Sequence, residues 1–123
     1  MRYTAKAIST ATSVAALLGT LSFAMPAISN ADAAAVAEGK TIAFDRKKGN
    51  CLACHQIEGG SLPGNIGPPL VAMKARFPDK DKLRAQIADP RMANPNTIMP
   101  PFGAHEILSA SEVDKVVEFI HTL

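Results

Sequence analysis

At 123 residues, with a formal net charge of +2, two cysteines and no tryptophan, the chain has the length of one small domain. Its nearly balanced charge excludes a strongly basic nucleic-acid-binding surface, and the sequence has no glycine-rich phosphate loop. A domain of this size commonly needs a disulfide, a metal or a cofactor to supplement its modest core.

Residues 1–33 have the composition of a secretory signal peptide. Arg2 and Lys6 form a positive start, and residues 7–31 carry no charge and consist of apolar residues diluted with Ser and Thr. Small residues then gather at positions 31–35, as they do around cleavage sites. This pattern predicts that the protein is exported.

We expect cleavage after Ala33 or Ala35, with an earlier option after Ala27. Removal of the first 33 residues leaves a domain over residues 34–123, with 11 Lys and Arg against 10 Asp and Glu. The alternative is an uncleaved membrane anchor. Its most apolar part, residues 14–27, is short and rich in Ala, Ser, Thr and Gly, so no stable anchor is expected.

The spacing of apolar residues predicts a first helix over residues 34–48, with Phe44 in the core. Gly39 is costly inside a helix, and we interpret it as the point where the last helix of the chain crosses closely. The basic run at residues 46–48 is either a solvated face or a docking surface.

Residues 51–55 read Cys-Leu-Ala-Cys-His, the attachment pattern of a c-type haem. Cysteines three positions apart lie on one face of a helical turn, so Cys51 and Cys54 can both form thioethers with one porphyrin while His55 reaches the iron. A thioredoxin-like dithiol is the first alternative, but residues 36–50 lack the β-branched run of a preceding strand. Zinc normally takes four ligands, and a disulfide across two intervening residues is sterically awkward.

Repeated glycines and prolines predict a loop over residues 56–69, wrapped against a large flat ligand. The carbonyl at or before Pro68 is a predicted acceptor for the second ring N–H of His55. Two short helices are expected next, over residues 70–77 and 80–88. Their expected inward residues are Leu70, Met73 and Phe77 in the first, and Leu83 and Ile87 in the second.

The C-terminal part begins with an irregular, proline-rich segment, residues 91–103, and ends in the clearest helix of the chain. Ser109 and Glu112 have the spacing of a capping box, with Leu108 and Val113 placed as the hydrophobic staple. The apolar stripe that should face the core comprises Val113, Val116, Val117, Ile120 and Leu123.

The sixth ligand of a haem iron bound by His55 has several candidates. Met99 is favoured, because a methionine just before two prolines lies in extended backbone and has no structural role of its own. Met92 is the runner-up and His105 stays open. Met73 fits a gap-filling core residue better, and His121 a cation at a helix C-terminus.

These motifs resemble the class I cytochromes c over residues 36–123. That family has a small all-α fold in which helices joined by proline- and glycine-rich loops wrap round one covalent haem. More narrowly, GNCLACH, GNIGPPL and MPPFG, followed by H-x-I-L-S-x-x-E, resemble the SoxX family, the mono-haem subunits of the SoxAX complexes of bacterial sulfur oxidation.

The resemblance implies that Cys51 and Cys54 hold one haem c in the periplasm, with His55 and Met99 as axial ligands. It implies a larger c-type cytochrome, SoxA-like, as partner and a soluble cytochrome c downstream. The complex couples thiosulfate to a carrier-protein cysteine at the larger subunit's haem, so this chain would transfer electrons and hold no catalytic residue. A stand-alone electron carrier and a haem-based ligand sensor remain the alternatives.

Overall fold

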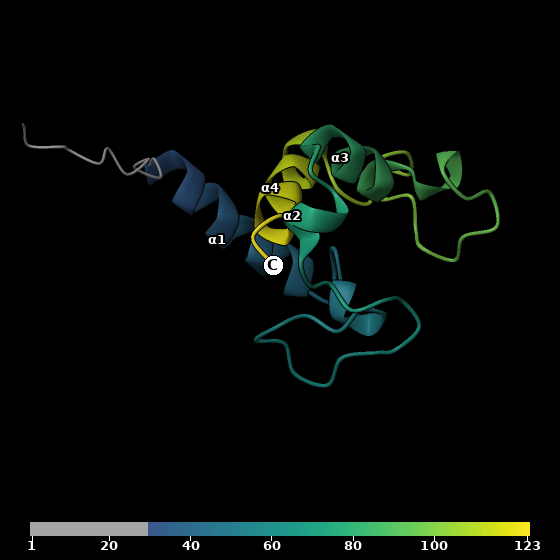
Figure 1. Cartoon of the computed structure of the whole chain (residues 1–123), viewed down its shortest axis with the longest axis horizontal. Coiled ribbons are helices and arrows are strands. Elements are labelled where there is room, and N and C mark those ends of the chain that lie inside the picture. The colour runs from purple at the N-terminus through teal and green to yellow at the C-terminus, as the bar shows by residue number, and fades with distance from the viewer. Residues whose placement is uncertain (1–29) are drawn as a thin grey trace, which may run out of the picture.

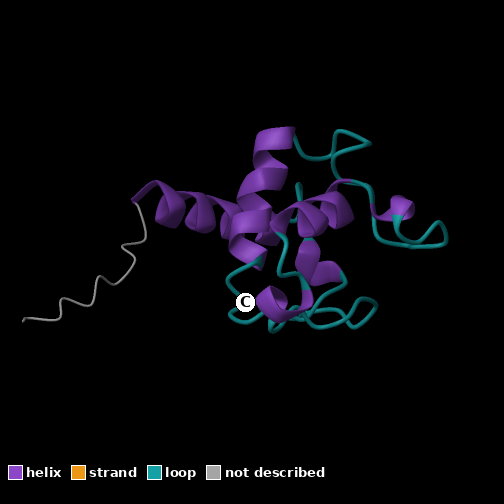
Figure 2. Cartoon of the chain, turned by 45° about the horizontal axis from the view of Figure 1, so that its top comes forward, coloured by secondary structure: helices purple, strands orange, loops and turns teal. Residues whose placement is uncertain are grey.

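The computed structural model describes residues 30–123, which form helices joined by long loops without a strand (Figures 1 and 2). The predicted signal peptide therefore lies outside the described residues, except for its last four positions. The elements are α1 (Asn30–Phe44), η1 (Cys51–Ala53), α2 (Met73–Arg76), α3 (Lys80–Ala88), η2 (Pro90–Met92) and α4 (Ala110–Ile120). The all-α expectation is confirmed.

Helix α1 crosses α4 at Gly39, as the sequence predicted (Figure 1). Gly39 is buried, and a Cβ placed on it would lie 1.9 Å from the Lys115 carbonyl oxygen and 3.0 Å from the Phe119 Cβ. Close to the crossing, the rings of Phe44 and Phe119 meet edge to face at 5.8 Å. The missing side chain at Gly39 thus lets two helix backbones approach directly.

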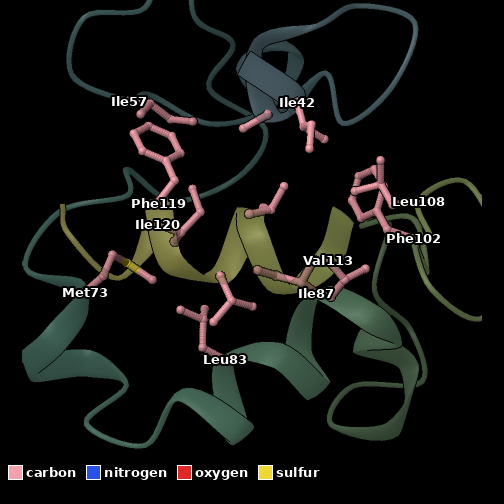
Figure 3. Packing of buried hydrophobic residues seen from close by; sticks show 13 residues of the cluster. Ile42, Ile57, Met73, Leu83, Ile87, Phe102, Leu108, Val113, Phe119 and Ile120 are labelled. Carbon is pink, nitrogen blue, oxygen red and sulfur yellow. The ribbon is translucent and has the colours of Figure 1, made fainter. Parts of the chain in front are cut away.

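Helix α4 lies at the centre of the apolar core (Figure 3). Four residues of its predicted stripe are fully buried: Val113, Val116, Val117 and Ile120. The fifth, Leu123, is partly buried and packs against the core at its edge. Phe119 is also buried, although the sequence interpretation left it out of the stripe. Phe119 lies on the side of α4 that faces α1. Because both α1 and α3 pack against α4, a single apolar stripe cannot describe both contacts.

The polar residues of α4 pair with the neighbouring helices. Lys115 binds Glu38 of α1 at 2.5 Å. Glu118 and Asp114 bind Lys80 and Arg84 of α3, both at 2.6 Å. These exposed pairs each add little stability, but together they fix which faces of the three helices meet.

The bounds of two helices differ from the prediction. Helix α1 begins at Asn30, four residues before the expected start at position 34. Helix α1 ends at Phe44, four residues early, because the Asp45 carboxylate accepts the Lys47 N–H at 2.8 Å and the Asp45 carbonyl accepts the N–H groups of Lys48 and Asn50, each at 3.0 Å. These bonds close a turn that replaces the next helical turn.

The second difference concerns α2, which covers residues 73–76 of the expected 70–77. Ala72 precedes it in the left-handed region at φ 52°, so the helix cannot extend backwards. Met73 is buried as expected, with its N–H donated to the Leu123 carbonyl at 2.8 Å. Helix α3 covers the predicted 80–88, capped by the Asp79 side chain.

The capping box of α4 is present, and its Glu112 also forms an ion pair with Lys48. Glu112 accepts the Ser109 N–H at 3.0 Å, the Ser109 hydroxyl accepts the Glu112 N–H at 3.3 Å, and Glu112 also binds Lys48. The hydrogen bond from Lys48, followed by the backbone bond from Ser109, lowers the pKa of Glu112 from 4.5 to about 2. The ionised carboxylate therefore stabilises the folded chain.

Replacing Glu112 with glutamine should lower the thermal midpoint at pH 7, because the amide keeps the cap and loses the charge. A depressed carboxyl pKa gives stability that is present above the unfolded value of 4.5 and lost as pH falls towards about 2. The difference from wild type should therefore shrink through this window and vanish near its lower end. Glu106→Gln is the control, since Glu106 has no ion pair among the described residues; a difference that persists at low pH would contradict this account.

Candidate functional site

The Cys-x-x-Cys-His motif forms a single helical turn, as expected. Asn50 enters it in the left-handed region at φ 45°, and Cys51–Ala53 form the 3₁₀ turn η1. The Cys51 carbonyl then accepts the N–H of Cys54 at 3.2 Å and that of His55 at 2.8 Å. Both thiols are free and half-buried, and both line the same cavity as the imidazole.

Burial raises the pKa of the Cys51 thiol from 9.0 to about 11. Redox-active dithiols depend instead on a lowered pKa, which supplies the reactive thiolate. The motif also lies between helices, with no strand before it in the described chain. Both observations speak against the thioredoxin-like alternative. Zinc finds no support either, because no group of three or more His, Cys, Asp or Glu side chains gathers among residues 30–123.

His55 is held by the loop that follows it. Its Nδ1 lies 2.7 Å from the Pro68 carbonyl oxygen, which confirms the predicted bond. Since a carbonyl only accepts, Nδ1 carries the proton and the Nε2 lone pair is left for a metal. Gly67 packs under the ring and donates its N–H to the Cys54 carbonyl at 2.8 Å. The loop therefore fixes both the tautomer and the ring plane.

Replacing Gly67 with alanine should displace this imidazole. A Cβ there would lie 2.4 Å from the His55 Cε1 and 2.6 Å from its Nδ1, so the ring must turn away from Pro68. We expect a loss of about 1–3 kcal/mol in the free energy of unfolding, measured in urea, with a shifted reduction potential.

The matched control is Gly60→Ala. Its Cβ would meet the Leu52 Cδ2 at 2.2 Å, which is the flexible end of a side chain and can move aside, and the Ile57 carbonyl oxygen at 3.1 Å, which needs a shift of only a few tenths of an ångström. A Gly67→Ala protein with the potential and stability of this control would show that the His55 ring is not held by the loop.

A cavity of about 550 Å³ opens beside the motif, within the range of about 300–1,000 Å³ usual for ligand sites. Apolar side chains line it from α2, α3, α4 and the loop just before α4: Met73, Leu83, Ile87, Leu108, Val116 and Ile120. Its charged lining residues are Arg46, Lys47, Lys48 and Arg76, and none of its lining residues, all within the described range, is acidic. A flat apolar ligand with anionic groups at its edge fits such a site.

Met99 lines this cavity from the loop between α3 and α4. Its side chain is half-buried, its N–H is donated to the Thr97 hydroxyl at 3.2 Å, and the Gln86 amide approaches its sulfur at 3.9 Å. Gln86 was not singled out from the sequence, although its position three residues after Leu83 places it on the same face of α3.

Of the other sixth-ligand candidates, only Met73 also lines the cavity. Met92 is 84% exposed and does not line the cavity. His105 is exposed, lies outside the cavity and contacts Arg91. Met73 lines the cavity as a core residue, as predicted, and the C-terminal cap of α4 is His121, whose Nε2 bonds the Phe77 carbonyl at 3.1 Å.

The two thiols, the imidazole and the thioether thus line one apolar cavity, and this donor set fits a c-type haem. The sequence model of the cytochrome c family matches residues 36–123. The chain belongs to the cytochrome c family. As a member it is an electron-transfer protein that carries one covalent haem c, which confirms the cofactor predicted from the motif.

Two known proteins are similar to this chain, and the first of them narrows its placement. One chain of the crystal structure of SoxXA from P. pantotrophus is 31% identical, with a TM-score of 0.63 over 70% of this chain and 79% of that one. An uncharacterized lipoprotein of Aquifex aeolicus (strain VF5) is 34% identical over 76 residues. The match covers 61% of this cytochrome c but only 37% of the length of that lipoprotein. The chain is therefore a class I cytochrome c similar to SoxX.

Proposed function

We propose that Cys51 and Cys54 hold the haem through thioether bonds and that His55 and Met99 bind its iron. The free lone pair on the His55 Nε2 and the half-buried Met99 sulfur, both at the same cavity, support this assignment. Bound haem supplies a one-electron couple, and a thioether ligand favours the ferrous state. If His55 and Met99 both held the iron, no ligand position would stay open for a substrate, which argues against a ligand sensor.

We further propose that residues 34–123 act in the periplasm as the mono-haem electron-transfer subunit of a SoxAX-type complex. The observation that carries this proposal is the 31% identity to a chain of SoxXA over 70% of this chain. In this role a larger c-type cytochrome oxidatively couples thiosulfate to a carrier-protein cysteine. This chain takes up the released electrons singly and passes them to a soluble cytochrome c. It would be part of an L-cysteine S-thiosulfotransferase and no catalyst alone.

Export is part of this proposal. The family match begins at residue 36, downstream of every cleavage site that we predict. No helix among residues 30–123 combines the length and apolar character that crossing a bilayer requires. A signal peptide removed near Ala33 or Ala35 is consistent with the start of the family match, and N-terminal sequencing of the exported protein tests it.

Exposed isoleucines at the mouth of the cavity support a lasting partner. Ile66, Ile98 and Ile107 line the cavity while 62%, 77% and 43% exposed. Ile66 and Ile98 come from different loops, so the apolar surface is assembled only in the fold. Large apolar side chains grouped beside cations commonly mark a protein interaction surface.

The experiment is mild purification of the tagged protein from its native host, followed by haem staining. We expect a larger c-type cytochrome to co-purify. Ile98→Asp should lose this partner and keep the haem spectrum, whereas Val71→Asp, at a 57% exposed residue outside the cavity, should keep both. A protein that purifies alone would favour the stand-alone electron carrier.

A further inference from the structure

The loop that carries Met99 is closed at its base, which we call the neck. The neck has two sides, residues 88–91 at the end of α3 and residues 103–105 where the loop returns (Figure 1). The Ala88 carbonyl accepts the N–H groups of Gly103 and Ala104, both at 3.0 Å. The position of Met99 is therefore set partly by how firmly these two sides hold together.

Side chains also join the two sides. The Arg91 guanidinium donates to the Asp89 carboxylate through Nε at 2.7 Å and through Nη2 at 2.9 Å. Its Nη1 lies 3.2 Å from the His105 Nε2. The contact between Arg91 and His105 joins the two sides of the neck, and Asp89 orients the Arg91 guanidinium for it.

The chemistry of this contact fixes the protonation of His105. A guanidinium only donates hydrogen bonds, so the His105 Nε2 must accept. A neutral imidazole with its proton on Nδ1 can accept there, and an imidazolium cannot. We propose that Arg91 and His105 form a pH-sensitive clasp that positions Met99: the neck is held when His105 is neutral and loosens when His105 takes up a proton.

The charged groups around His105 are Arg91 of η2, Asp89 at the end of α3 and Glu106, its neighbour in the chain. Protonation removes the acceptor and places a second cation against Arg91, and the attraction of the Asp89 carboxylate for the imidazolium offsets part of this repulsion. Asp89 cannot supply the same response, because its hydrogen bond from Arg91 holds its pKa below the ordinary carboxyl range. The clasp rests on the proposed role of Met99 as iron ligand.

The test uses imidazole as a probe that replaces Met99 on the ferric iron. At saturating neutral imidazole the binding rate reports opening of the Met99 loop. We expect this limiting rate to rise about three- to tenfold as pH falls from about 8 to about 5, which is the fold-change that the loss of one hydrogen bond produces.

Three variants and one control separate the roles of His105 and Arg91. His105→Gln keeps an acceptor at every pH and should stay slow. His105→Ala and Arg91→Ala should be fast at every pH. Arg84→Ala, which removes a comparable exposed ion pair with Asp114 away from the neck, should behave as wild type.

A His105→Ala protein with the wild-type limiting rate and pH profile would overturn the clasp. Failure of the Met99 assignment looks different. In that case the wild-type ferric protein lacks the far-red absorption band of methionine-ligated haem, whatever the neck variants do.

Discussion

Replacing Met99 with alanine should abolish the far-red absorption band of the ferric protein and convert the iron to a high-spin form. The thioether lines the haem cavity from a loop, and no other candidate ligand that lines it is free to replace it, because Met73 is 2% exposed within the core and accepts a hydrogen bond from Arg76 at 3.4 Å. Loss of the thioether should lower the reduction potential by on the order of 0.1–0.2 V, within the roughly 0.8 V that axial ligands span.

The matched control is Met92→Ala. Met92 is the same residue type in the same α3–α4 connection, but it is 84% exposed and lies outside the haem cavity. Its spectrum and potential should equal those of wild type. Survival of the far-red band in Met99→Ala, or its loss in Met92→Ala, would reassign the sixth ligand.

Replacing Gly39 with alanine should destabilise the protein, although the same change at an ordinary helical site stabilises. Helix propensity alone favours alanine over glycine by about 1 kcal/mol. Here the new Cβ would lie 1.9 Å from the Lys115 carbonyl oxygen and 2.5 Å from its carbon, which are backbone atoms of α4 and cannot turn aside. The two helices must separate, and we expect a net loss of about 2–4 kcal/mol in the free energy of unfolding.

Urea unfolding of the haem-loaded protein, followed by circular dichroism, measures this loss. Ala37→Gly is the control, since Ala37 is exposed in the same helix and should cost only the propensity difference of about 1 kcal/mol. A Gly39→Ala protein as stable as wild type or more stable would show that the helices can move apart at no cost. The direct backbone contact would then have no energetic role.

Much of the site could be predicted because its chemistry is local in sequence. Cys51, Cys54 and His55 lie within one turn, and the Pro68 carbonyl follows in a loop whose prolines and glycines restrict its path. The capping box of α4 is likewise a four-residue pattern. Such features depend on short-range geometry, which the sequence states directly.

Contacts between distant segments were harder to predict. Phe119 is buried because α1 covers its side of α4, and a single helical stripe gives no sign of a second neighbour. The early end of α1 depends on a turn closed by Asp45, which competes with the helix through its own side chain. Gln86 and Arg76 join the haem cavity only through the arrangement of α2 and α3.

The sequence by itself determined the haem chemistry, the all-α class and the glycine at the helix crossing, because each is encoded by a spacing or a residue type. It left open which of Met92, Met99 and His105 lies at the haem cavity. The tertiary structure separates these candidates by position, since the folded neck and the packing of α3 against α4 place Met99 at the cavity, expose Met92 and turn His105 towards Arg91. These positions support the proposal that Met99 is the ligand, and they depend on how separate segments meet, which no local pattern records.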